Sequence, residues 1–481
     1  MSVDKDALVK PRLLRGFRDY LPEQMIARQK MIATIREVYE RYGFVPLDTP
    51  AMEYTETLLG KYGEESSKQI FRFVDLEGND VALRFDLTVP LARVVAQYQD
   101  LPRPFRRYQV GPVWRFDKPD PGRFREFIQF DLDTVGSDSM AADAEILSGI
   151  CDTMEALGIE RYRVRCSNRK ILNALIAFAD VDPRRATHVF RVIDKIDRIG
   201  REGVRQELTR GRVDASGDVI PGLGLDERAV SRIMEFLNIA GSTRAEVLDA
   251  LDELFRGIPG AQQGIDELRR IDEYLTALDI SEQKVVFDVS IARGLDYYTG
   301  PIFETILLDA PEFGAVFSGG RYDGLVERFL GEKIPATGAS IGVDRLLAAL
   351  LKLGVVELRP STAQVLVTVM EPDRLVEYQK ITRRLRQAGI NAELYLGPDR
   401  SIRKQLKYAD RQQIPIAVIV GPDEFARREV SIKDLREGLR RQGEVSERSE
   451  WLKARFGQVT VPRDKMLDVI REILDQEARG L

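Results

Sequence analysis

The residues around Arg115 and Arg123 are of the types that bind a phosphorylated nucleotide. Arg115 lies within an apolar run, and a loop with two prolines joins that run to a second one near Phe127. Guanidinium groups make forked hydrogen bonds with phosphate oxygens, and an aromatic ring can stack on a base. This segment therefore predicts a nucleotide site, with a charged hairpin that binds nothing as the alternative.

The second run continues with polar residues at every other position. Gln129, Asp131 and Asp133 alternate with apolar residues, and residues two apart in a strand point to the same face of the sheet. We therefore expect three polar side chains in a row, where they could read a polar substrate.

Asp86 and Thr88 are also two positions apart, directly after an apolar run. They would share a face if the strand continues through them. A carboxylate and a hydroxyl placed in this way could together hold an ammonium group. An ion pair on an edge strand is the alternative interpretation.

Three further segments place charged or aromatic residues beside glycines. The run RGLDYYTG covers residues 293–300, GGRYDG covers 319–324 and GASIGVDR covers 338–345. Glycine allows a ligand to approach the backbone closely, so each segment is a candidate for binding. Turns with packed tyrosines are the alternative for the first two. In the third, Arg345 would lie early in an apolar helix, where its charge needs a partner.

The scarce residue types exclude several other chemistries. The chain has two cysteines, Cys151 and Cys166, and one histidine, His188. A structural zinc site takes four ligands, mostly Cys and His, which this set does not supply. The sequence also lacks H-E-x-x-H, G-x-S-x-G, G-x-x-x-x-G-K-[ST] and G-x-G-x-x-G. Chemistry here must then rest on arginines, carboxylates, tyrosines and hydroxyls, and no dedicated metal site is expected.

Length and composition indicate several globular domains. The 481 residues correspond to about three domains of ordinary size, and 44% apolar residues supply their cores. No apolar run approaches the roughly 18 residues that a membrane span needs. The N-terminus has no apolar segment typical of a secretory signal, and two cysteines support no disulfide framework. We therefore expect a cytoplasmic protein without a membrane partner.

The elements that must position these residues form a mixed pattern. Strand-like runs and helices follow one another without a regular βαβ order, which predicts an α+β fold with a largely antiparallel sheet. Charged helical stretches from about 180 to 275 predict a helical insertion. The expected strands cover residues 44–47, 70–74, 81–85, 110–116, 127–135, 285–289 and 302–306, and the expected helices cover 22–43, 88–98, 139–157 and 340–353.

A separate C-terminal domain is indicated after a linker at residues 354–363. Strands and helices then alternate, which predicts a small α/β domain with a mostly parallel sheet. From Ala363 onward there are 23 Lys and Arg against 19 Asp and Glu, although the whole chain carries −5. This balance favours an anionic partner, with a merely solvated surface as the alternative. The expected strands are 365–370, 392–396 and 416–420, and the expected helices lie near 374–388 and 401–413.

Taken with these motifs, the chain resembles the histidyl-tRNA synthetases over nearly its whole length. Residues 15–22, RGFRDYLP, are similar to the opening motif of that family. The Arg115 hairpin resembles motif 2 of class II synthetases, and residues 338–351 resemble motif 3. Residues 293–298, RGLDYY, are similar to a signature of the histidyl enzymes, and with residues 319–324 they make the resemblance specific.

The resemblance implies a fold and an activity. It implies a class II catalytic domain in residues 1–360, an antiparallel sheet flanked by helices with the helical insertion at about 180–275, and an anticodon-binding domain in residues 361–481. It also implies a homodimer. The implied activity is that of a histidine–tRNA ligase, which activates histidine with ATP and Mg²⁺ and transfers it to the 3′ end of its tRNA.

The resemblance also assigns histidine-binding residues. A carboxylate and a hydroxyl would hold the α-amino group, a glutamine would contact the amino acid, and a second carboxylate with a phenol would read the imidazole. In that order these are Asp86, Thr88, Gln129, Asp133 and Tyr298, with Tyr322 nearby. A site whose buried polar groups pair with both ring nitrogens would reject amino acids that leave them unpaired.

For ATP, the resemblance assigns Arg115 to the α-phosphate and Arg123 to the outer phosphates. Phe127 would stack on the adenine, and Arg345 would contact the phosphates from the other side. Arg293 would lie between the histidine carboxylate and the α-phosphate, so Arg293 and Arg115 are the expected catalytic residues. Fixed cations would stabilise the charge that grows on the α-phosphate oxygens, and no side-chain nucleophile is needed.

Two positions depart from the commoner family pattern, since many members have Glu at the position of Asp117 and His at that of Ile128. This loop lies near the acceptor stem in the family, so the reading of that stem stays open. The main alternative function is the histidyl-synthetase-like regulatory subunit of ATP phosphoribosyltransferase, without aminoacylation activity. Such subunits typically lack the C-terminal domain and the catalytic arginines, both of which this sequence retains. Another class IIa synthetase or a tRNA-binding scaffold are further alternatives, and residues 293–298 argue against the first.

Overall fold

The structure is a computed structural model that describes residues 9–59, 70–119, 122–214, 217–292, 297–436 and 457–478. The described residues form two compact units, one from residues 9–19 and 28–356 and the other from residues 20–27 and 357–478. Within the described part of the chain, no helix is long and apolar enough to cross a membrane.

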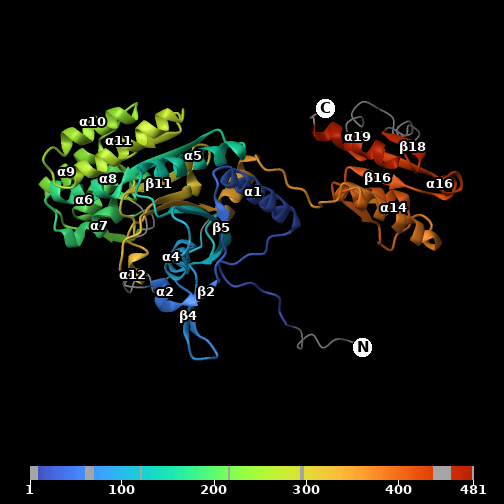
Figure 1. Cartoon of the computed structure of the whole chain (residues 1–481), viewed down its shortest axis with the longest axis horizontal. Helices are drawn as coiled ribbons and strands as arrows, with labels where there is room; N and C mark the ends of the chain where they lie inside the picture. The colour runs from blue at the N-terminus through green and yellow to red at the C-terminus, as the bar shows by residue number, and fades with distance from the viewer. Residues whose placement is uncertain are drawn as a thin grey trace. The chain divides into compact units, whose positions relative to one another are not determined.

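An eight-stranded sheet forms the centre of the first unit (Figure 1). Its five inner strand pairs are antiparallel, and the two outermost pairs are parallel. The predicted largely antiparallel sheet is therefore confirmed. In spatial order the strands are β1 (Val45–Pro46), β5 (Phe105–Trp114), β6 (Glu126–Val135), β13 (Ala336–Gly342), β12 (Ala315–Arg321), β11 (Pro301–Leu307), β7 (Tyr162–Asn168) and β10 (Val285–Phe287).

Helices α1 (Pro22–Arg41) and α5 (Met140–Ala156) cover the apolar face of β6. Tyr39 of α1 contacts Phe130 edge-on, with ring centroids 4.9 Å apart. On α5, Gly149 lies against Leu132. Since side chains alternate along a strand, the opposite face of β6 carries the polar row. Helix α13 (Val343–Leu353) also packs against β6.

A smaller antiparallel sheet lies beside α4 and α2 (Figure 1). The turn at Gly78, where φ is +88°, joins its strands β3 and β4. Helix α4 confirms the helix expected at 88–98. The elements are β2 (Met52–Tyr54), α2 (Thr55–Leu59), β3 (Arg72–Val74), β4 (Asp80–Leu83) and α4 (Thr88–Gln97).

Residues 169–277 are mostly helical and lie together in Figure 1. The helical character expected for 180–275 is confirmed, although a short antiparallel hairpin interrupts it. The helices are α6 (Arg169–Phe178), α7 (Ala186–Ile193), α8 (Ile196–Leu208), α9 (Glu227–Leu237), α10 (Arg244–Leu254) and α11 (Ala261–Ala277), and the hairpin is β8 (Gly211–Val213) with β9 (Val219–Pro221).

Two glycine-containing segments are central strands where the sequence pattern predicts other structure. Strand β12 includes the glycine-rich residues 318–321, and β13 includes residues 340–342, which were expected in the helix that begins at Val343. Glycine has low strand propensity, which hides such strands. Here it allows close packing, because a Cβ on Gly319 would lie 2.2 Å from the carbonyl oxygen of Gly338.

The second unit is a five-stranded sheet with four helices among its described residues. The two pairs around β14 are parallel and the two pairs made by β17 are antiparallel, so the expected mostly parallel sheet is only half right. The strands, in spatial order, are β15 (Ala392–Leu394), β14 (Val365–Val367), β16 (Ile416–Ile419), β17 (Glu429–Asp434) and β18 (Gln458–Pro462), and the helices are α14 (Leu375–Gln387), α15 (Ile402–Arg411), α16 (Pro422–Arg427) and α19 (Met466–Ala478).

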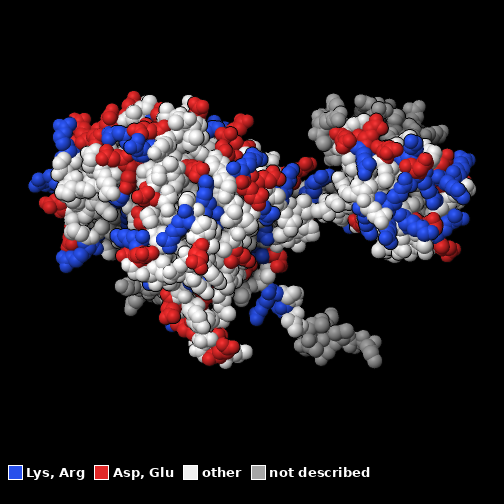
Figure 2. Space-filling view, in the orientation of Figure 1, with Lys and Arg blue, Asp and Glu red and all other residues white. Residues whose placement is uncertain are grey.

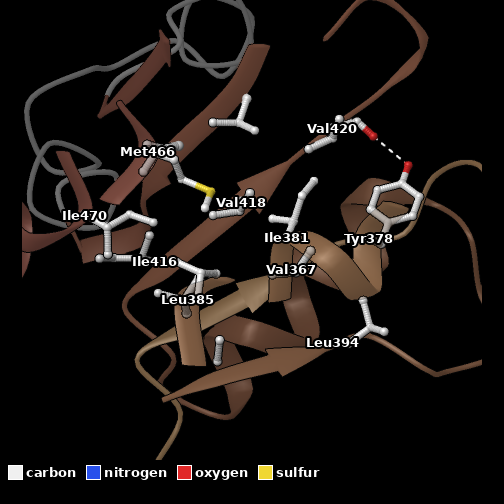
Figure 3. Close-up of a cluster of buried hydrophobic side chains, with 14 of the residues drawn as sticks. Val367, Tyr378, Ile381, Leu385, Leu394, Ile416, Val418, Val420, Met466 and Ile470 are labelled. Atoms are coloured by element: carbon white, nitrogen blue, oxygen red, sulfur yellow. Dashed lines mark hydrogen bonds between the residues drawn. The ribbon is translucent and has the colours of Figure 1, made fainter. Parts of the chain in front are cut away.

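This unit has a core of its own (Figure 3). Val367 and Val418 of the sheet pack with Leu385 of α14 and Met466 of α19, all at 1% exposure or less. The buried Tyr378 hydroxyl donates to the carbonyl oxygen of Val420 at 2.6 Å. A separate core is what an independently folding domain requires.

Candidate active site

Strand β6 presents a buried row of polar side chains. Gln129, Asp131 and Asp133 are 7%, 1% and 2% exposed. They lie on one face, as the alternation in the sequence predicts. Burial raises the pKa of both carboxylates, and the charge of Asp133 further raises the pKa of Asp131. A buried row of this kind needs partners of opposite charge.

Arg107 is the partner that the sequence analysis missed. It lies on β5 directly opposite Asp133 and is completely buried. Its Nη2 is 2.9 Å from Asp133 Oδ2 and 4.0 Å from Asp131 Oδ2. The expected strand began at 110, whereas β5 begins at Phe105. A longer strand in antiparallel register would have indicated the pair.

Two further residues fix the position of the Asp133 carboxylate. The hydroxyl of Tyr322 donates to Asp133 Oδ1 at 2.5 Å. On β13, a Cβ on Gly338 would lie 2.0 Å from the same oxygen, so only glycine leaves room for this carboxylate. Asp133 and Tyr322, both assigned to the histidine site, are thus in direct contact.

Asp86 and Thr88 do not share a strand face, contrary to expectation. Strand β4 ends at Leu83 and α4 begins at Thr88, and Asp86 Oδ1 accepts a hydrogen bond at 3.0 Å from the backbone N–H of Val89 in the first turn of that helix. Burial raises the pKa of Asp86. Its other oxygen, Oδ2, is buried and has no hydrogen-bond partner among the described residues. A buried oxygen of this kind suits a cationic ligand.

Arg115 lies at the end of the polar row. Its Nε donates to the carbonyl oxygen of Phe85 at 2.8 Å, and its Nη2 lies 3.5 Å from Gln129 Oε1. The guanidinium is 5.4 Å from the centre of the Phe127 ring. Gln129 in turn donates to Ser340 Oγ at 2.5 Å. The structure therefore brings Arg115, Gln129 and Phe127 together.

Arg123 lies in the loop between β5 and β6, and Arg345 lies in α13 near the same loop. Arg123 is half exposed and pairs with Asp117 of its own loop, with Nη2 to Oδ2 at 2.8 Å. Arg345, in the first turn of α13, donates to the carbonyl oxygen of Ala315 at 2.8 Å. A Cβ on Gly122 would lie 3.5 Å from Arg345 Cγ, so the loop residue before Arg123 lies beside Arg345.

Asp344 anchors the start of α13. Its Oδ2 accepts from the backbone N–H of Ile128 at 2.7 Å, and its Oδ1 pairs with Arg28 of α1 at 2.8 Å. The carboxylate is 3% exposed. These contacts fix the helix turn that carries Arg345 against β6, and the sequence analysis did not assign Asp344 this role.

The tyrosines of the two glycine-flanked segments form a cluster. Tyr297 contacts Tyr298 and Tyr322, with ring centroids 5.0 and 5.9 Å apart. Tyr297 also hydrogen-bonds the Thr88 side chain. Burial and then the charge of Asp133 raise the pKa of Tyr298. Arg293 belongs to residues 293–296, which lie outside the described residues, so its assigned position stays a prediction.

The geometry suits a small zwitterion beside a phosphate. The unpartnered carboxylate oxygen of Asp86 can accept an ammonium group, and Asp133 with the tyrosines can pair with polar ring atoms. Arg115 adds a fixed positive charge at the other end of the row. Among the described residues, no group of three or more His, Cys, Asp or Glu side chains is placed to hold a metal ion.

Comparison with known proteins decides the family. A family model for histidyl-tRNA synthetase matches residues 16–346, and a model for an anticodon binding domain matches residues 364–455. The chain belongs to the histidyl-tRNA synthetase family. This synthetase is accordingly a ligase with the histidine–tRNA ligase activity of its family, as the resemblance implied.

Relatives that match nearly the whole chain support the same family assignment. The histidine–tRNA ligase of Ruegeria sp. (strain TM1040) is 47% identical to this synthetase over 96% of this chain and 95% of the relative. That of Brucella abortus (strain S19) is 44% identical over 99% and 98%. The crystal structure of histidyl-tRNA synthetase from Nostoc sp. PCC 7120 is 33% identical, covers 97% of this chain and 100% of that one, and has a TM-score of 0.80. These matches do not favour the regulatory-subunit alternative.

Proposed function

We propose that this synthetase joins histidine to its tRNA in two steps at the site built around β6. Histidine and ATP first form histidyl-adenylate and pyrophosphate, and histidine then passes to the 3′ end of the tRNA. The observation that carries the proposal is the position of Gln129, which lies in the polar row and within 3.5 Å of Arg115. The amino-acid end and the phosphate end of the site therefore meet at one side chain.

Histidine would bind along the row. The unpartnered Asp86 oxygen and the Thr88 hydroxyl would hold the α-amino group at the start of α4. Gln129 would contact the same amino acid, since its amide lies between Ser340 and Arg115. The imidazole would be read by Asp133 and Tyr298, with Tyr322 donating to Asp133 from beside them.

ATP would bind beyond Arg115. The adenine would stack on Phe127, which already lies against the Arg115 guanidinium. Arg123 and Arg345 would contact the outer phosphates, and Arg123 would then exchange Asp117 for phosphate oxygens. Mg²⁺ would arrive as part of the nucleotide substrate, bridging its outer phosphates.

The chemistry follows from the charges. In the first step the histidine carboxylate oxygen attacks the α-phosphorus, and the bond to pyrophosphate breaks. Arg115, and Arg293 in its assigned position, would stabilise the charge on the α-phosphate oxygens. In the second step the tRNA 3′-hydroxyl attacks the mixed anhydride, and an oxygen of the departing phosphate takes the proton. Neither step requires a protein nucleophile.

The tRNA would use the C-terminal unit. We assign residues 361–481 to anticodon binding and residues 1–360 to catalysis, with the insertion at about 180–275. Lys and Arg side chains gather on the face of the C-terminal unit visible in Figure 2. Such a face suits the phosphates of a nucleic acid.

We also propose a cytoplasmic homodimer. The short strands β1, β2 and β3 carry exposed apolar side chains, which water disfavours and a second subunit would cover. These are Val45, Met52, Tyr54, Phe73 and Val74. Cys151 and Cys166 are free and buried, which fits a reducing compartment.

Amino-acid-dependent ATP–pyrophosphate exchange tests the proposed reaction directly. All twenty amino acids are assayed separately, without tRNA, and histidine alone is expected to support exchange. A different active amino acid would leave the class II chemistry standing and overturn the assignment of Asp133 and Tyr298. No exchange with any amino acid would overturn the synthetase proposal itself.

Removal of the residues after about 360 tests the assignment of the two domains. The shortened protein is expected to keep histidine-dependent exchange, because the described site residues all precede the deletion, and to lose most tRNA charging. Both rates are measured on the same preparation, with the full-length chain as control. Charging at the full-length rate would contradict the assignment of anticodon binding to residues 361–481.

A further inference from the structure

Arg107 is the most deeply buried charged side chain near the site, and no role in catalysis or binding has yet been assigned to it. It is 0% exposed. A guanidinium group is costly to bury, and the cost is offset only when the group is paired and hydrogen-bonded. Its partners therefore show what its burial achieves.

Those partners belong to both halves of the proposed histidine site. Arg107 Nη2 lies 2.9 Å from Asp133 Oδ2, in the half that would read the imidazole. The same nitrogen donates at 3.0 Å to the carbonyl oxygen of Leu87. Leu87 stands between Asp86 and Thr88, which would hold the α-amino group. One guanidinium thus joins the two parts of the pocket.

Two buried carboxylates face the single positive charge of Arg107. Asp131 and Asp133 are both buried carboxylates, and among the described residues Arg107 forms ion pairs with them at 4.0 and 2.9 Å. Burial raises the pKa of Asp133, and Arg107 opposes that rise. The other polar or titratable groups near Asp131 and Asp133 among the described residues are Arg84 after β4, Gln109 on β5, Ser340 on β13, Tyr322 after β12, Tyr298, Tyr39 on α1 and Asp86 before α4.

We propose that Arg107 is a positioning residue for histidine, which keeps Asp133 ionised and fixes it relative to the Asp86–Thr88 segment. The proposal rests on the proposed function, in which Asp133 reads the imidazole. Arg107 does not touch the substrate in this scheme. It acts through the Asp133 carboxylate, which must be ionised and held in one position if it is to accept a hydrogen bond from the imidazole.

The first test replaces Arg107 in the full-length enzyme and measures pyrophosphate exchange. In Arg107→Met the KM for histidine is expected to rise about 100-fold, because a buried carboxylate loses its cation. The KM for ATP should stay within about threefold, since Arg115 and Phe127 are untouched. Arg107→Lys keeps a positive charge but loses the guanidinium nitrogen that reaches both Asp133 and Leu87, so it should recover part of the loss.

The pH profile separates positioning from mere structural support. Loss of the cation raises the pKa of Asp133 further, and only the ionised carboxylate binds the ring. The histidine KM of Arg107→Met should therefore fall as the pH rises from roughly 6 to 9, more steeply than in the unaltered enzyme. A variant that is only less stable would show no such recovery.

Arg106→Met is the matched control. Arg106 is the preceding residue of β5, points to the other face and pairs with Glu145 at 2.7 Å. The Arg106→Met substitution removes an arginine from the same strand and leaves the contacts of Asp133 unchanged. The histidine KM should therefore stay within about threefold. Circular dichroism melting curves establish that each variant is folded. If Arg107→Met does not fold, Arg107→Lys and its pH profile still test the proposal.

The outcomes distinguish this proposal from the one on which it rests. If Asp133→Asn raises the histidine KM and Arg107→Met does not, the function stands and the role of Arg107 is wrong. If neither raises it, the assignment of Asp133 to the ring is itself wrong. A loss in Arg107→Met that neither lysine nor high pH relieves would also overturn the positioning role.

Discussion

Replacement of Arg115 by alanine is expected to lower the rate constant of histidyl-adenylate formation by about 1000-fold, or about 4 kcal/mol. The side chain is held in place before substrate binds: Nε donates to the Phe85 carbonyl oxygen at 2.8 Å, and the guanidinium lies over the Phe127 ring. A preorganised cation needs no rearrangement when charge grows on the α-phosphate. The loss should therefore appear mainly in kcat.

Single-turnover formation of histidyl-adenylate, followed by rapid quench, measures this effect without tRNA. Arg115→Lys keeps the charge and loses the planar fork, so an intermediate rate is expected. Lys352→Ala provides a control, because that lysine is 61% exposed, pairs with Glu312 and has no assigned role in the site. An Arg115→Ala enzyme within tenfold of the unaltered rate would contradict the assignment of Arg115 to the α-phosphate.

Asp133→Asn is expected to raise the KM for histidine by about 100-fold or more, with little change in the KM for ATP. The substitution is nearly isosteric, so it removes charge without opening a cavity. It leaves the buried Arg107 guanidinium without its 2.9 Å partner and replaces the acceptor of the Tyr322 hydroxyl. The expected effect is on recognition of the ring, because the arginines proposed to bind phosphate keep their contacts.

Tyr322→Phe is the graded comparison for that experiment. It removes one hydroxyl and leaves the carboxylate paired with Arg107, so a rise of about tenfold in the histidine KM is expected. Steady-state exchange at saturating ATP gives the KM for histidine, and exchange at saturating histidine gives the KM for ATP. Equal histidine KM values in Asp133→Asn and the unaltered enzyme would show that Asp133 does not read the substrate.

The sequence pattern predicted the parts of the site that depend on local order. Alternation along residues 129–133 placed three polar side chains on one face of β6, and the structure shows that row. Asp86 was expected on a continuing strand, yet its carboxylate accepts from the backbone N–H of Val89 in the first turn of α4. The residue pattern is compatible with both structures, and only the backbone turn after Leu83 decides between them.

What the pattern could not predict depends on pairing between distant segments. The expected strand began at 110 and left out Arg107, and only the register of β5 with β6 shows that Arg107 is buried against Asp133. Strands β12 and β13 were missed because their glycines lack the side chains by which a strand is recognised. The contacts of Asp344 could not be predicted for the same reason, since its partners Arg28 and Ile128 lie in other elements.

The absence of a side chain at Gly338 has a consequence for changing the substrate of this enzyme. The carboxylate of Asp133 occupies the space where a Cβ at position 338 would be, 2.0 Å away. The side chains at positions 133 and 338 must therefore be chosen together, although they lie on different strands. A library that varies residue 133 to accept a different amino acid must vary residue 338 with it, and a larger residue at 338 demands a shorter one at 133. In the proposed site, the backbone at position 338 therefore limits the size of the side chain that residue 133 can carry.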